Sequence, residues 1–319
     1  MSGRHFISTV AVGVAALVLL GAAPAKAQKM TMSSGAPGGI WYGISAGLSK
    51  LLSDNGVPFT AEQGQGNSNI INVAANKVEI GFSYATVLHH AKGGTAVFKK
   101  PITNTRALAT LFEQAQHTLV TLKSGVTTFK GLKGQRFASH TLASSARLMF
   151  LDVLKVHGLT GLEDELKIVV RGNPATCAKA VKDRQAIGMH GAWFPPAGAI
   201  TEVTIALPGR LLPISDDKYK ELAKLNAGYN RAVVPGGVYK GIDKDVPTIS
   251  SSTLIITNDA MSDETAYKIV KILATHIDEV KSINAGAFKG ISPKFMANTT
   301  VIPYHPGAAK YYREVGALK

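Results

Sequence analysis

The chain has 319 residues, of which 45% are hydrophobic and 18% are charged. This composition excludes a largely disordered protein, and the length favours two lobes over one compact core. The formal net charge of +14 favours anionic partners, but the basic residues are scattered without a basic–aromatic stripe, so we expect no nucleic-acid partner.

Residues 1–27 have the pattern of a secretory signal peptide. Arg4 precedes an almost wholly apolar run at residues 10–23, and Ala25 and Ala27 are small residues before a cleavage site. A retained membrane anchor is the alternative, although the run is short for a membrane span. Because no later run is long enough to cross a bilayer, we expect cleavage after Ala27 and a periplasmic mature protein.

The first unit after the signal predicts an anion site. Residues 30–33 read as a strand, residues 35–39 as a glycine-rich turn, and Ile44, Leu48, Leu51 and Leu52 keep helical spacing. A helix N-terminus presents unpaired N–H groups and a positive dipole end, which suit a carboxylate or phosphate. The alternative is that the glycines only make a tight turn.

Two further strand–turn–helix units follow. A strand at residues 57–63 leads into a glycine-rich turn and a helix beginning near Asn69, and a strand at residues 78–84 leads into a helix at residues 85–92. Three such units predict a parallel, helix-covered sheet, with ligands and Tyr84 at the C-terminal edge of its strands.

The pattern restarts in the middle of the chain, which predicts a second lobe. Strands are expected at residues 106–111 and 118–122, the second a candidate crossing between lobes. A strand at residues 135–139 and a turn at residues 140–143 then lead into a helix opened by Ser144 and Ser145. These serines either cap the helix or also contact a ligand.

The remaining elements complete the two lobes. Strands at residues 167–170 and 186–189 flank a helix at residues 175–182, and Trp193 begins a loop that should border the cleft. Residues 204–207 and 211–214 have β character, and residues 216–226 are helical. A strand at residues 249–257 would cross back, followed by a helix from Ser262. Two adjacent crossings would form a hinge.

Catalytic and metal-binding motifs are not found in the sequence. It has no Walker loop, dinucleotide fingerprint, G-x-S-x-G elbow, H-E-x-x-H or CxxC. His89 and His90 are adjacent and would point in different directions on a helix. The lone Cys177 reads as a small buried residue. We therefore expect binding without chemistry, with no metal and no cofactor.

The order of several short motifs resembles one family. Residues 303–316 (PYHPGAAKYYREVG) and 234–241 (VPGGVYKG) are its most specific pieces; weaker ones are Gly38-Gly39-x-Trp41-Tyr42, residues 80–82 and residues 132–134. Over essentially the whole mature chain, the sequence is similar to the TAXI-type solute-binding proteins of tripartite ATP-independent periplasmic (TRAP) transporters. In this chain Gly66 stands where the family commonly carries Ser, and Tyr84 where Gln is frequent.

The resemblance implies a two-lobed α/β fold of the periplasmic binding protein class, type II-like, in which each lobe is a mixed, mainly parallel sheet covered by helices. We assign residues 28–118 and 252–319 to lobe 1 and residues 119–251 to lobe 2. The terminal motif should be structural, with Tyr311 and Tyr312 packed on lobe 1.

The resemblance also implies a function without catalysis. Such a protein traps a small organic anion, such as a glutamate-like or 2-oxoglutarate-like carboxylate, and delivers it to integral-membrane TRAP permease subunits; we expect a monomer. A binding protein that feeds a sensory kinase is the alternative, and a secreted enzyme is a third. The predicted ligand contacts are Gly38, Gly39, Trp41, Tyr42, Gly66, Asn67, Ser68, Asn69, Tyr84, His140, Thr141, Ser144, Ser145 and, bordering the cleft, Trp193.

Overall fold

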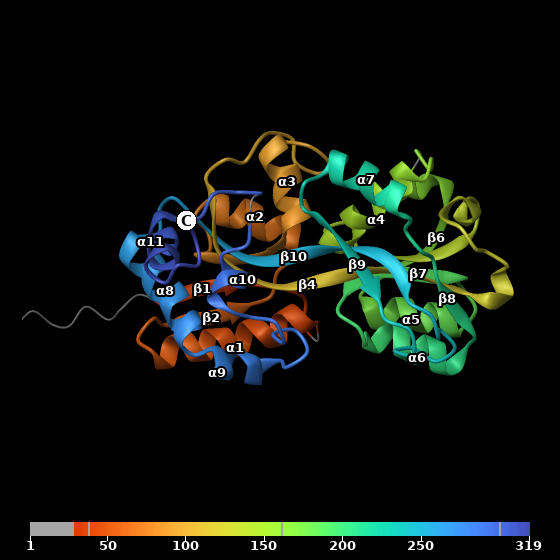
Figure 1. Ribbon diagram of the computed structural model, residues 1–319. Coiled ribbons are helices and arrows are strands. Elements are labelled where there is room, and N and C mark those ends of the chain that lie inside the picture. Colours follow the sequence, from red (N-terminus) through yellow and green to blue (C-terminus); the bar gives the residue numbers. More distant parts are fainter. Residues whose placement is uncertain (1–28, 38, 161, 300) are drawn as a thin grey trace, which may run out of the picture.

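The computed structural model describes residues 29–319 except residues 38, 161 and 300. The predicted signal peptide and the predicted ligand residue Gly38 therefore lie outside the described residues. The described chain forms a two-lobed α/β molecule (Figure 1). Among its helices, none is long and apolar enough to span a membrane.

Lobe 1 begins with the three predicted strand–helix units. Strand β1 pairs in parallel with β2 and β3, so the ends of the strands and the starts of the following helices meet at one edge. Helix α1 buries Ile44, Leu48 and Leu52, which recur at helical spacing. Helix α2 begins at Gly66, earlier than the predicted start near Asn69, because Gln65 is the last extended residue. The elements are β1 (Met30–Ser33), α1 (Ile40–Asp54), β2 (Phe59–Glu62), α2 (Gly66–Ala74), β3 (Ile80–Tyr84) and α3 (Ala85–Gly93).

Two long antiparallel strands, β4 (Thr105–Thr121) and β10 (Val246–Asn258), run from one lobe into the other (Figure 1). The prediction of separate strands at residues 106–111 and 118–122 was wrong, because β4 continues through the polar residues between them. Those polar side chains find partners in the sheet: the Glu113 carboxylate accepts hydrogen bonds from Asn230 and Ser250 at 3.0 and 2.6 Å. A polar stretch therefore does not end this strand.

Lobe 2 repeats the arrangement, with β5 parallel to β6 and β7. The predicted strand at residues 204–207 is wrong: Thr204 lies in α6, where its hydroxyl donates to the Ile200 carbonyl at 3.0 Å. The strand expected at residues 211–214 is displaced: β8 covers Gly209–Leu211, and residues 212–214 are not in a strand. Strand β9 was not predicted. The elements are β5 (Arg136–His140), α4 (Ser145–Val156), β6 (Lys167–Gly172), α5 (Pro174–Lys182), β7 (Gly188–Trp193), α6 (Gly198–Ala206), β8 (Gly209–Leu211), α7 (Asp216–Leu225) and β9 (Tyr229–Val234).

The C-terminal segment returns to lobe 1. It comprises α8 (Asp263–Thr275), α9 (Ile277–Ile283), α10 (Pro293–Met296) and α11 (Pro306–Glu314). Tyr311 and Tyr312 are buried there, as predicted, and the Tyr312 hydroxyl donates to the Leu108 carbonyl of β4 at 2.8 Å. The terminal motif therefore fastens α11 to the central sheet.

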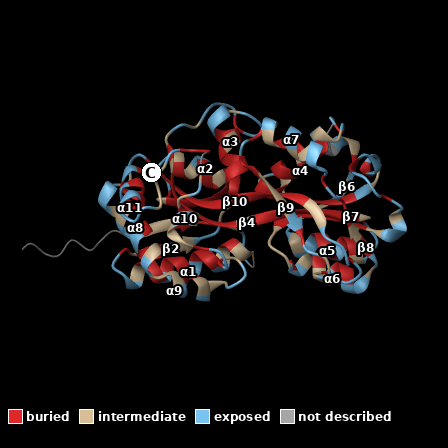
Figure 2. Cartoon of the chain, in the orientation of Figure 1, coloured by how far each residue is buried: buried red, intermediate tan, exposed pale blue. Residues whose placement is uncertain are grey.

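The strands form one curled mixed sheet in the order β2-β1-β3-β10-β4-β7-β5-β6, with β8 paired to β4 and β9 to β10. Figure 2 shows that β4 and β10, at its centre, are mostly buried. The helices cover this sheet in both lobes (Figure 1). Loops at the strand ends of the two lobes are thereby brought to face each other across the middle of the molecule.

Candidate functional site

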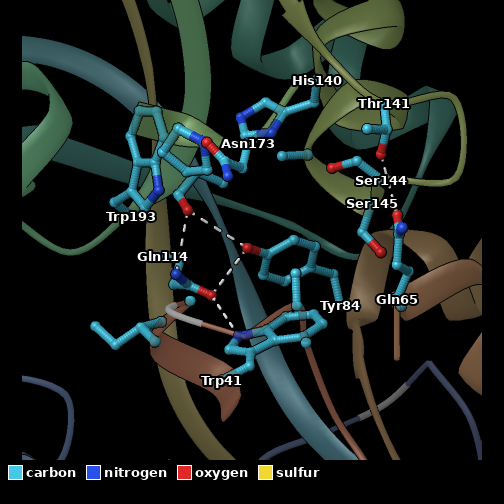
Figure 3. A pocket seen from close by; sticks show the side chains of 18 of the residues that line it. Trp41, Gln65, Tyr84, Gln114, His140, Thr141, Ser144, Ser145, Asn173 and Trp193 are labelled. Atoms are coloured by element: carbon cyan, nitrogen blue, oxygen red, sulfur yellow. Dashed lines mark hydrogen bonds between the residues drawn. The ribbon is translucent and has the colours of Figure 1, made fainter. Parts of the chain in front are cut away.

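A cavity of about 220 Å³ lies between the lobes. Figure 3 shows its side chains converging from both sides. Lobe 1 provides the starts of α1 and α2 and the end of β3, lobe 2 provides the starts of α4 and α5 and the end of β7, and β4 contributes Gln114. The lining residues are Gly35, Ala36, Gly39, Ile40, Trp41, Gly64, Gln65, Gly66, Tyr84, Gln114, His140, Thr141, Ser144, Ser145, Ala146, Gly172, Asn173, Pro174, Ala192 and Trp193.

Five helix N-caps line the cavity: Gly39 of α1, Gln65 of α2, Tyr84 of α3, Ser144 of α4 and Asn173 of α5. The caps of α1, α2 and α4 make no side-chain capping hydrogen bond. In the first turn of α3 the Thr86 N–H donates to the Ser251 hydroxyl oxygen at 3.2 Å, and at α5 the Asn173 side chain accepts from the Thr176 N–H. Uncapped first-turn amides remain available to a bound anion, and the dipoles of the helices favour negative charge.

The floor of the cavity is an aromatic platform held by Gln114. The amide oxygen of Gln114 accepts hydrogen bonds from the Trp41 indole and the Tyr84 hydroxyl, both at 2.9 Å, and its amide nitrogen donates to the Ala192 carbonyl of β7 at 3.1 Å. The rings of Trp41 and Tyr84 meet edge to face, with centroids 4.8 Å apart. Burial raises the pKa of the Tyr84 hydroxyl far above its usual value, so it stays protonated.

The two lobes touch directly beside the cavity. The Thr141 hydroxyl of lobe 2 donates to the Gln65 side-chain oxygen of lobe 1 at 3.2 Å, and the Ser145 hydroxyl donates to the Asn67 side-chain oxygen at 3.3 Å. Gly66 permits this approach, since a Cβ at its position would overlap the Ser145 hydroxyl. The two lobes are therefore in direct contact beside the cavity.

The cavity lining carries no Asp, Glu, Lys or Arg side chain among the residues that the structure describes. His140 is neutral near pH 7, because burial lowers the pKa of its imidazole to about 4 despite a hydrogen bond to the His190 backbone. Its Nε2 atom is buried without a hydrogen-bond partner. An anion in this cavity would consequently meet dipoles and polar hydrogen atoms instead of formal positive charges.

The predicted ligand residues divide into two groups. Tyr42, Asn67, Ser68 and Asn69 do not line the cavity. Asn69 is a structural residue, since its amide nitrogen donates to the Ser34 and Phe82 carbonyls at 2.8 and 2.9 Å. The structure brings together at the cavity Gly39, Trp41, Gly66, Tyr84, His140, Thr141, Ser144, Ser145 and Trp193.

Three polar lining residues were missed by sequence reasoning: Gln65, Gln114 and Asn173. Asn173 had a recognisable signal, because an Asn-Pro pair before an apolar-periodic segment is typical of a helix start. Gln114 had none, since its hydrogen-bond partners are distant in the chain. The basic residues Arg147 and Arg171, which could have met a carboxylate, do not line the cavity.

Other titratable residues are buried away from the cavity. Burial raises the pKa of the Cys177 thiol to about 11, in agreement with its predicted role as a buried residue. His90 contacts Asp152 at 3.1 Å, and His89 shares no metal-binding cluster with it. Within the described residues, no three His, Cys, Asp or Glu side chains gather in a way that could hold a metal ion.

Solved structures share this fold at low sequence identity. PhnD1 from Prochlorococcus marinus, in complex with methylphosphonate, superposes with a TM-score of 0.54 at 11% identity, over 80% of this chain and 88% of that chain. R. palustris Rpa4515 with adipate gives 0.52 at 16% identity, over 91% and 93%. A protein from Bordetella bronchiseptica RB50 gives 0.52 at 14% identity, over 91% and 89%.

These similarities confirm the expected fold class, the two-lobed α/β fold of periplasmic binding proteins. The sequence itself matches one family over nearly its whole described length, from residue 32 to residue 316. This chain therefore belongs to the NMT1-like family.

Proposed function

We propose that the protein is a periplasmic solute-binding protein that captures a small organic anion between its lobes and delivers it to the membrane subunits of a TRAP transporter. One observation carries the capture of an anion: the N-termini of five helices, from both lobes, surround one cavity whose described lining has no Asp, Glu, Lys or Arg side chain. Backbone amides and helix dipoles at such termini bind anions.

The composition of the lining favours a carboxylate without an ammonium group. An acidic amino acid would bring an ammonium that finds no Asp or Glu in the described lining, and an unpaired buried charge is costly. Of the two expected ligand types, a C4 to C6 dicarboxylate is therefore favoured over a glutamate-like one. Trp41, Tyr84 and Trp193 would cover its carbon skeleton.

Capture would occur by closure of the lobes. We propose that residues 28–118 and 252–319 move relative to residues 119–251, and that β4 and β10, which cross between them, bend. The contacts Thr141–Gln65 and Ser145–Asn67 form only when the lobes meet. Ligand hydrogen bonds to both lobes would favour the closed form, because they exist in that form alone.

Isothermal titration calorimetry of the mature chain, residues 28–319, tests the ligand class. Glutarate and 2-oxoglutarate should bind with micromolar or tighter dissociation constants, about −8 kcal/mol. Glutamate should bind more weakly, and the uncharged analogue glutaramide should not bind. Absence of binding by every carboxylate, or equal binding of glutaramide, would contradict an anion site.

Delivery to a permease needs its own experiment. Ligand uptake into proteoliposomes that contain the cognate membrane subunits should require this protein. Ligand-dependent phosphorylation of a sensory kinase, without uptake, would instead support the alternative role. Chemical conversion of the bound ligand would support the third alternative, a secreted enzyme, and would contradict binding without catalysis.

A further inference from the structure

A second cavity, of about 530 Å³, lies at the other end of β7 from the ligand cavity. Ala192 and Trp193 at the end of β7 line the first cavity, whereas Ala186 and Ile187, just before β7, line the second. The ends of β4, α5 and α6 complete it, together with the short 3-10 helix η1 (Leu122–Ser124). In Figure 1 this region lies at the opposite end of the molecule from α11.

The walls of the second cavity are apolar and tied together by the backbone. The apolar lining consists of Leu122, Val181, Ala186, Ile187, Leu207 and Pro208. The Thr121 N–H donates to the Ile187 carbonyl at 2.8 Å, and the Leu122 N–H donates to the Pro208 carbonyl at 2.9 Å. Leu122 nevertheless leaves 43% of its surface exposed. An apolar hollow of this size, already formed, lies in the range that binds small molecules.

Two cations line the same cavity, Lys123 and Arg184. Nearby acidic side chains are engaged elsewhere, since Asp183 pairs with Lys179 and Glu202 pairs with Lys182. Throughout the described part of the chain, neither Lys123 nor Arg184 has an ion pair. Their positive charges are therefore uncompensated beside an apolar hollow.

The backbone of Arg184 is strained, because its φ of +59° lies in the left-handed region. Glycine or asparagine occupies this region at lower cost than arginine. Arginine therefore occupies a position at which the left-handed backbone conformation favours glycine or asparagine. Strained residues of this kind concentrate at functional sites.

We infer that this cavity is a second binding site, for an amphipathic carboxylate with one aliphatic chain. The chain would lie along Leu122, Ile187 and Leu207, and the carboxylate would pair with Lys123 and Arg184. Apolar walls alone would accept an uncharged ligand, and two surface cations alone would accept any anion. Their combination selects a ligand that has both parts.

Calorimetry with hexanoate, octanoate and decanoate, below their micelle concentrations, tests the site on the mature chain. One molecule should bind per chain, and affinity should rise about fourfold for each added methylene, as transfer of a methylene from water predicts. Decanol should bind at least tenfold more weakly than decanoate. Affinity that does not depend on chain length, or decanol that binds equally well, would overturn the proposal.

Variants separate this site from the cleft. The double variant Lys123→Gln/Arg184→Gly should lose at least tenfold in decanoate affinity, whereas Lys77→Gln, a surface charge loss outside both cavities, should not. Arg184→Gly should melt no lower than the wild type, since glycine relaxes the left-handed backbone. A folded double variant that binds decanoate normally would refute the site.

Two further measurements test where decanoate binds and whether Lys123 and Arg184 bind a membrane surface instead. Gly66→Ala, which obstructs closure of the cleft, should leave decanoate binding unchanged, and loss of binding would place decanoate in the cleft instead. Sedimentation with phosphatidylglycerol vesicles should show no binding that depends on Lys123 and Arg184. If vesicles bind through these residues and free decanoate does not bind, the two cations contact a membrane surface, which would contradict the proposal.

Discussion

The indole Nε1 of Trp41 donates a hydrogen bond to the side-chain oxygen of Gln114 at 2.9 Å, and both residues are buried beneath the ligand cavity. The same oxygen accepts from Tyr84 at 2.9 Å and from Thr253 at 3.1 Å. One amide therefore organises residues from α1, β3 and β10, and its nitrogen extends the network to β7.

Replacing Gln114 by leucine should destabilise the fold, because the donors of Trp41, Tyr84 and Thr253 would lose their acceptor in a buried place. We expect the free energy of unfolding, measured by urea denaturation, to fall by about 3 kcal/mol. Gln63→Leu at an exposed position is the control and should change it by less than about 0.5 kcal/mol. Equal stability of the two variants would mean that the network is not structurally important.

Gly66→Ala should weaken ligand binding without weakening the fold. Alanine suits the first turn of α2, but its Cβ would overlap the Ser145 hydroxyl across the cleft. We expect at least a tenfold loss of ligand affinity with an unchanged melting temperature of the ligand-free protein.

The second change Ser145→Gly removes the opposing side chain and should restore part of that affinity in the double variant. A double-mutant cycle with no coupling between positions 66 and 145 would show that the two residues do not meet during capture.

The protein should lose stability as the pH falls from 6.5 toward 4. Burial lowers the pKa of both His117 and His140 to about 4, whereas histidines in the unfolded chain titrate near 6.5. Protons therefore bind the unfolded chain first across this interval, and stability that is present above pH 6.5 is lost on acidification.

The expected loss is on the order of 3 kcal/mol for each of these two histidines. Urea denaturation at pH 7 and at pH 4.5 measures it. His140→Asn should reduce this pH-dependent loss without abolishing it, because the buried His117 imidazole remains. A wild-type stability that does not change across the interval would contradict burial of neutral imidazoles.

Tyr312→Phe should lower the free energy of unfolding by about 1 kcal/mol, because the Leu108 carbonyl loses its donor in the core. Tyr267→Phe is a matched control: its hydroxyl donates to Glu314 at 2.6 Å in an exposed place, where water replaces the bond. Thermal denaturation followed by circular dichroism distinguishes the two variants. Equal decreases in melting temperature would contradict the role of the Tyr312 hydrogen bond in holding α11 against β4.

The elements predicted best from the sequence are those whose secondary structure is determined by their own short segment of chain. Strands β1 and β3 and helices α1, α3 and α5 follow from local apolar periodicity and from glycine or proline at their ends. The strand prediction at Thr204 was wrong because β-branched residues favour strands only on average, whereas tertiary packing stabilises α6 at this position.

The missed parts depend on contacts that are distant in the chain. Gln114 looked like an interruption between two strands, yet it bonds residues that lie 73 and 30 positions away. The polar residues of β4 are satisfied only by neighbours across the sheet, so no local window reveals that the strand continues. Which residues of the predicted turns reach the cavity likewise depends on how the lobes meet.

Strands β4 and β10 remain hydrogen-bonded to each other from the Ala115–Ser250 pair to the Thr105–Asn258 pair. Because the Ala115–Ser250 end of this ribbon reaches the proposed boundary between the lobes, the proposed opening of the protein would bend the chain at the end of a bonded ladder and not at free linkers. Amide protons of this ribbon should therefore exchange with solvent among the slowest in the molecule, with or without ligand. The proposed hinge between the lobes would then adjoin the part of the backbone whose hydrogen bonds break least often.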